Sequence, residues 1–171
     1  MDAQESYVIK EAVDITSIDY EQYGVLYNLS GDGIDTQNTN NSSGDGWTDV
    51  DTRIPLLDTL GSLGYTHGSG TPFLAGEMER HLHTQEAQIP LEQAIVFCVA
   101  KASQDAPKIS DVIPVILRPG FVFVLHRSVW HTSSHGLTGA AHYHWMALAY
   151  QNEPTVWEKI IGGPVCVHAP S

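Results

Sequence analysis

Three short apolar runs in the second half of the chain constrain the fold most strongly. Residues 93–100, 112–117 and 121–125 are rich in Val, Ile and Phe, which favour β-strands over helices. Turn-forming residues such as Pro119 and Gly120 separate these runs, at the spacing expected of an all-β sandwich or barrel. The pattern therefore predicts a mostly β fold with few short helices.

The first half of the chain is less regular. Residues 7–13 and 25–29 are short stretches of mixed apolar and polar residues, and residues 18–23 can form a turn of helix between them. Residues 54–63 are either helical or extended.

One polar segment interrupts this first half. Residues 32–46 are almost entirely Gly, Asp, Asn, Ser and Thr, with Ile34 as the single apolar residue, and we expect a surface loop there. The total of 171 residues suits one domain, which can bury roughly 70% of its unfolded surface. The sequence therefore predicts a single domain over residues 1–171.

The charge balance excludes several classes of partner. Eight Lys and Arg face twenty Asp and Glu, giving a net charge of −12, and no basic run could neutralise phosphates. Nucleic acids and anionic membranes are not expected partners. The N-terminus lacks a basic and apolar leader, and no apolar run approaches the roughly 20 residues that span a bilayer. We expect a cytoplasmic protein with Cys98 and Cys166 reduced.

Histidines are concentrated in two segments of the chain. Five of the nine lie within residues 77–86 and 125–135. On a strand, side chains alternate between faces, so His81 and His83 would project from one face together with Glu79. Two imidazoles at this spacing can share one metal ion.

Further metal ligands must come from elsewhere in the fold. Glu86 follows where the chain can bend back toward the pair, and a strand beginning after Pro119 and Gly120 would return His131 to the same cavity. The predicted ligands of a divalent transition metal, Ni, Zn, Mn or Fe, are His81, His83, Glu86 and His131. Two histidines and a carboxylate also suit non-haem iron, so an iron-dependent dioxygenase is an alternative function.

Four residues are candidates for catalysis: His144, His126, Glu79 and Arg80. An imidazole titrates near neutral pH, so His144 or His126 is expected to carry a proton, while Glu79 beside Arg80 should stay ionised and orient other groups. His144 begins an apolar strand and could line the barrel or its rim. Five histidines, taken singly, are expected to be solvent-facing or structural: His67, His126, His135, His142 and His168.

Three segments resemble the ureidoglycolate lyase family, which has a cupin fold. Residues 77–81 (E-M-E-R-H) with 87–91 (A-Q-I-P-L) resemble its E-L-E-R-H…A-F-I-P segment, and residues 126–131 (H-R-S-V-W-H) resemble its Y-H-R-x-V-W-H segment. Residues 18–24 are similar to its F-x-x-Y-G opening. The resemblance implies a cupin-type antiparallel β-barrel or jelly roll, acting as a homodimer that cleaves a carbon–nitrogen bond of a small molecule.

The chain departs from the family pattern at two places. Ala149 and Tyr150 stand where family members have an Asp-Arg pair, so a cation that could hold a carboxylate is absent there. Glu86 stands where many members have Gln, and His83 is added. We therefore expect a metal-dependent small-molecule lyase whose substrate is not ureidoglycolate. The alternatives are a cupin isomerase, cyclase, decarboxylase or dioxygenase acting on an oxygenated or aromatic metabolite, and a non-catalytic small-molecule-binding cupin.

Overall fold

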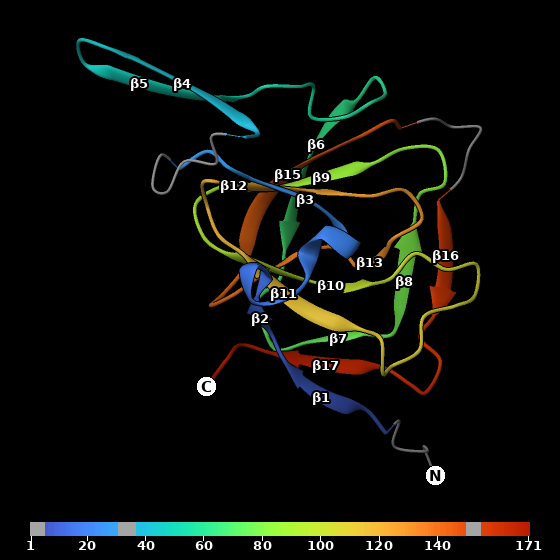
Figure 1. The fold of residues 1–171 in the computed structure, drawn as a ribbon. Coiled ribbons are helices and arrows are strands. Elements are labelled where there is room, and N and C mark those ends of the chain that lie inside the picture. The colour runs from blue at the N-terminus through green and yellow to red at the C-terminus, as the bar shows by residue number, and fades with distance from the viewer. Residues whose placement is uncertain (1–5, 31–36, 150–154) are drawn as a thin grey trace.

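A computed structural model describes residues 6–30, 37–149 and 155–171 of the chain. These residues form four β-sheets and two short 3₁₀-helices, η1 (Ile15–Ser17) and η2 (Tyr20–Gln22) (Figure 1). None of the helices in this part of the chain is long and apolar enough to cross a membrane. The prediction of a mostly β fold with few short helices is confirmed.

One large sheet has five strands and carries part of the candidate site. Its strands, in spatial order, are β3 (Gly24–Asn28), β12 (Phe121–Leu125), β9 (Glu86–Pro90), β15 (Ala141–Ala147) and β6 (Ser62–Gly68). Antiparallel pairing with β12 and β15 fixes both edges of β9, so Glu86 lies opposite Leu125 on one side and Ala147 on the other.

The second large sheet has seven strands and carries the remaining part of the site. Its main path runs β16 (Val156–Lys159), β8 (Glu77–Arg80), β13 (Trp130–His131), β10 (Ile95–Ala100), β11 (Ile113–Leu117) and β2 (Val13–Asp14), and β14 (His135–Gly136) also pairs with β10. The two-residue strand β13 joins β8 to β10 and sets His131 directly opposite Glu79.

Two smaller sheets complete the architecture. β1 (Val8–Glu11), β17 (Val165–His168) and β7 (Phe73–Ala75) form a three-stranded sheet, and β4 (Thr39–Gly44) pairs with β5 (Trp47–Thr52) as a hairpin that projects from the body (Figure 1). The large sheets pack face to face as a jelly-roll-like sandwich and do not close into a barrel within the described part of the chain.

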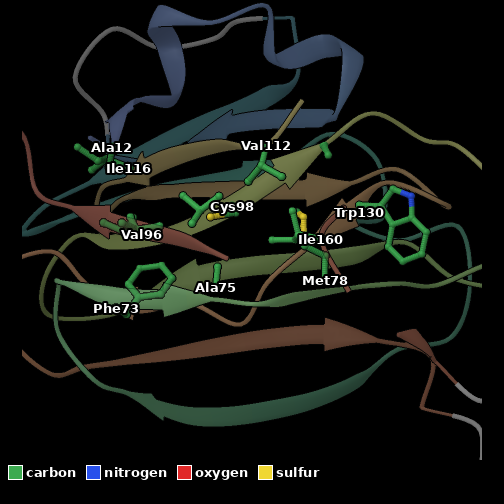
Figure 2. Packing of buried hydrophobic residues seen from close by; sticks show 13 residues of the cluster. Ala12, Phe73, Ala75, Met78, Val96, Cys98, Val112, Ile116, Trp130 and Ile160 are labelled. Carbon is green, nitrogen blue, oxygen red and sulfur yellow. The ribbon is translucent and has the colours of Figure 1, made fainter. Parts of the chain in front are cut away.

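The longest apolar run of the chain forms strand β10, which is buried on both faces. All six of its residues are buried, because Ile95, Phe97 and Val99 face the core between the large sheets while the alternate residues face the three-stranded sheet. Figure 2 shows the cluster that the alternate residues form, in which Val96 and Cys98 lie among side chains from the three-stranded sheet. Both faces of the strand are therefore apolar.

Strand β15 separates two environments by the same alternation. Tyr143 and Trp145 pack into the core between the large sheets, whereas Met146 packs against a third cluster on the opposite face of the five-stranded sheet. His142 and His144 consequently belong to that opposite face, away from the core between the sheets.

The predicted strands over residues 93–100, 112–117 and 121–125 are confirmed as β10, β11 and β12. Residues 53–61 contain neither helix nor strand, and β6 begins at Ser62. The expected loop over residues 32–46 contains strand β4, whose side chains are mostly exposed and gave no apolar pattern by which to recognise it. Residues 32–36 of that segment lie outside the described residues.

The two cysteines are free, as expected, and differ sharply in environment. Cys98 is fully buried, and burial raises the pKa of its thiol to about 12, whereas Cys166 is partly exposed. Because the thiolate is the reactive form, a thiol reagent such as dithiobis-nitrobenzoate should titrate one cysteine in the native protein and two after unfolding. Fast modification of both in the native protein would contradict this burial.

Candidate functional site

Four acidic and histidine side chains meet between the large sheets. Glu79 lies on β8, His131 lies opposite it on β13, His81 follows the end of β8, and Glu86 begins β9. One donor atom each from Glu79, His81 and His131 lies within 4.8 Å of the other two, and no other group of three His, Cys, Asp or Glu in the described ranges does so. Spacing of this kind suits a shared metal ion.

Glu86 bridges the two histidines of the group. Its Oε2 atom is 2.7 Å from Nε2 of His81, and its Oε1 atom is 3.7 Å from Nε2 of His131. Nε2 of His131 is also 3.9 Å from Oε1 of Glu79. Two carboxylates and two imidazoles therefore converge, and Glu79, His81 and Glu86 retain 15%, 11% and 12% side-chain exposure.

The imidazole of His131 is oriented toward the carboxylates. Its Nδ1 atom is 3.2 Å from the carbonyl oxygen of Val129, to which the Nδ1–H donates. Its Nε2 atom is buried and has no hydrogen-bond partner. A ring held by a backbone carbonyl through one nitrogen, with the other nitrogen directed at acidic oxygens, is typical of metal-binding histidines.

The electrostatics of the cluster favour a cation. Burial acts to raise the pKa of Glu86, but the nearby imidazole of His131 and the hydrogen-bonded imidazole of His81 outweigh it and hold that pKa at about 2. Burial raises the pKa of Glu79, and the neighbouring Glu86 charge adds to this. Burial acts to lower the pKa of His131, yet the two carboxylates raise it above its usual value. The buried carboxylates thus draw positive charge to this point.

Gln88, Ser134 and Tyr143 extend the cluster into the core, and the sequence analysis did not identify them. Nε2 of Gln88 donates to Oε1 of Glu86 at 2.5 Å, and Oγ of Ser134 donates to Oε1 of Gln88 at 2.8 Å. The backbone N–H of Ser134 donates to the hydroxyl of Tyr143 at 3.2 Å. Gln88 lies two residues after Glu86 on one strand, so the period-two argument used for His81 could have found it.

The arrangement of His83 differs from the expected one. β8 ends at Arg80, so His81 and His83 do not share a strand face, and Leu82 between them is exposed. Nε2 of His83 lies 3.1 Å from the carbonyl oxygen of Leu148, and its ring centroid lies 6.4 Å from that of His81. The group with metal-ligand spacing contains the predicted ligands His81 and His131 together with Glu79, and it includes neither His83 nor Glu86.

Three of the catalytic candidates have contacts away from the cluster. His126 is exposed, with Nε2 3.3 Å from the carbonyl oxygen of Glu21, and His144 directs Nδ1 at the carbonyl oxygen of Gly64, 3.0 Å away. The Arg80 guanidinium lies 4.6 Å from the centre of the Trp130 ring and donates to carbonyl oxygens of the 103–104 turn. Tyr150, which with Ala149 stands where family members have an Asp-Arg pair, lies outside the described residues.

The fold and the cluster define a jelly-roll-like β-sandwich with a buried histidine–carboxylate centre. No protein-family model and no curated protein match the chain, so the resemblance to ureidoglycolate lyases rests on the short segments alone.

Comparison with solved structures found 10 matching chains, among them two sugar-nucleotide epimerases. The dTDP-4-dehydrorhamnose 3,5-epimerase from Elizabethkingia anophelis NUHP1 is 10% identical with a TM-score of 0.45, over 68% of this chain and 69% of that one. The dTDP-6-deoxy-D-glucose-3,5-epimerase from Legionella pneumophila Philadelphia 1, in complex with dTDP-4-keto-L-rhamnose, is 12% identical with a TM-score of 0.44, over 67% and 66%.

Proposed function

We propose that this protein is a metal-dependent enzyme that acts on a small molecule at the Glu79–His81–His131 centre. The observation that carries the proposal is the buried Nε2 atom of His131, which has no hydrogen-bond partner and faces two carboxylates. A buried polar atom without a partner costs free energy, and a divalent ion bound there would remove that cost. Glu86, which contacts both histidines, completes the donor set.

The donor set indicates the class of ion. Two imidazoles and two carboxylates suit Zn, Ni, Mn or Fe better than Ca or Mg, which prefer oxygen ligands alone. The negative charges of both carboxylates would balance a divalent ion. That ion would supply Lewis-acid polarisation of a substrate carbonyl or hydroxyl group.

The chemistry that we propose is proton transfer next to the polarised group, as in an isomerase or a lyase. The Glu86–Gln88–Ser134 hydrogen-bond chain holds one carboxylate in a fixed orientation beside the centre. Fixed orientation of this metal ligand would hold the ion beside the reacting group and lower the cost of reaching the reactive geometry. Cleavage of a carbon–nitrogen bond, which the short family segments suggest, belongs to this class of reaction.

Metal analysis of the full-length, untagged protein tests the proposal. We expect about one Mn2+ ion per chain after loading with Mn2+, an ion that favours carboxylate ligands, and dialysis. That ion should be lost in Glu79→Gln and retained in His83→Ala. Glu77→Gln is the matched control, because it removes the same charge from an exposed position on the same strand. Absence of bound metal in the folded wild-type protein, or equal loss in Glu77→Gln, would overturn the proposal.

An iron-dependent oxygenase is the second candidate. Glu79, His81 and His131 supply two imidazoles and one carboxylate, the ligand set of many non-haem iron oxygenases. Oxygen uptake and deuterium exchange distinguish the two candidates. Both are measured with the Fe2+-loaded protein and a panel of small hydroxy and keto acids. Oxygen uptake that is lost in Glu79→Gln favours the oxygenase, while metal-dependent deuterium exchange into a substrate without oxygen uptake favours the isomerase or lyase.

A further inference from the structure

A second group of histidines lies on the opposite face of the five-stranded sheet. The pairing of β6 with β15 sets His142 directly opposite His67 and sets His144 directly opposite Tyr65. The rings of His67 and His142 have centroids 4.6 Å apart and are tilted by 31°. Residues far apart in the sequence thus place two imidazoles side by side, outside the core between the sheets.

A carboxylate fixes one of these two rings. Oε1 of Glu92 accepts hydrogen bonds from Nδ1 of His142 at 2.9 Å and from the backbone N–H of the same residue at 3.1 Å. The Nδ1–H of a neutral imidazole is therefore engaged, and the lone pair of His142 is on Nε2. A carboxylate that orients a histidine in this way commonly supports a metal ligand and increases its basicity.

The neighbouring rings restrict the movement of the pair. Tyr65 stacks on His142 with centroids 5.3 Å apart and an interplanar angle of 16°. Tyr65 also contacts the edge of His144, whose Nδ1 is held by the carbonyl oxygen of Gly64. His67 is exposed and the side chain of His142 is 40% exposed, so an ion from solvent can reach the pair.

We propose that His67 and His142 form a second metal site, for a transition-metal ion that favours imidazole, such as Cu2+, Ni2+ or Zn2+. Glu92 orients His142 and adds negative charge beside the ion. Within the described residues only the Glu79 group places three donors within 4.8 Å, so this site offers two protein nitrogens and leaves the other positions to water. The net charge of −12 favours cation binding at an accessible site. The site does not depend on the function proposed above.

Titration with Cu2+ tests this site in the full-length, untagged protein. We expect a bound equivalent that persists in Glu79→Gln, disappears in His67→Asn, and shows coupling to nitrogen in the electron paramagnetic resonance spectrum. Glu92→Gln should weaken this equivalent by about 10-fold or more, because losing the group that orients a histidine ligand has that effect. His126→Asn, at another exposed histidine, should leave it unchanged.

The outcomes separate this proposal from the proposed function. Loss of the equivalent in His67→Asn with retention in Glu79→Gln supports the second site, whatever happens at the first. Persistence of every Cu2+ equivalent in a His67→Asn/His142→Asn variant with a native circular dichroism spectrum would overturn it. Equal weakening by His126→Asn would also overturn it, because binding would then reflect dispersed surface histidines.

Discussion

Replacing His131 with alanine is expected to lower the affinity of the Glu79–His81–His131 centre for Zn2+ or Mn2+ by about 100-fold or more. Loss of a residue that merely orients a ligand already costs about 10- to 100-fold, and in the proposed site His131 is a direct ligand. Without metal, the variant also leaves Glu79 and Glu86 buried beside one histidine instead of two. Removing one partner of a buried ion pair typically destabilises a protein by about 3–5 kcal/mol.

Two measurements check this prediction. Competition with a chromophoric chelator gives the metal affinity, and urea unfolding in the presence of a chelator gives the free energy of unfolding of the metal-free protein. His126→Ala is the control, since that exposed imidazole has its contact with the carbonyl oxygen of Glu21. An affinity for His131→Ala within a few-fold of wild type would remove His131 from the ligand set.

Phe97→Ala is expected to lower the stability of the folded protein strongly. Phe97 is fully buried on β10, between the large sheets, with its ring centroid 6.3 Å from that of Phe123. Truncating a buried phenylalanine typically costs about 3–5 kcal/mol, through lost burial and the cavity left behind. Since a domain of this kind is stable by only about 5–15 kcal/mol, the variant should unfold at much lower urea concentration.

Urea unfolding followed by tryptophan fluorescence measures this cost. Leu60→Ala is the matched control, because Leu60 is 84% exposed and its truncation should change the free energy of unfolding by less than about 0.5 kcal/mol. If both variants unfolded at the same urea concentration as wild type, the core between the large sheets would not be the main source of stability.

The two metal proposals place ions on opposite faces of one sheet. Glu86 and Gln88 project from β9 toward the core between the sheets, while His142 and His144 project from β15 to the other face. Period-two alternation keeps these sets apart although their strands are hydrogen-bonded neighbours. Substitutions in one set should therefore leave metal binding by the other unchanged, which makes the two proposals independently testable.

The sequence determined the fold class and the region of the site. Runs such as residues 93–100 could only be buried on both faces, and a strand with an apolar sheet on either side satisfies that requirement. The same reasoning could not recover β4, because an exposed polar hairpin has no apolar alternation to detect. The concentration of histidines in two segments of the chain was also sufficient to predict that His81, Glu86 and His131 belong to one metal site.

Only the tertiary structure decided which side chains meet. β8 ends at Arg80, and this separates His83 from the strand face on which the i and i+2 argument depended, while pairing of β13 with β8 brings in Glu79. His67 and His142 look unrelated along the chain, and register between β6 and β15 makes them neighbours. Strand ends and register depend on contacts between distant segments, which a local pattern does not contain.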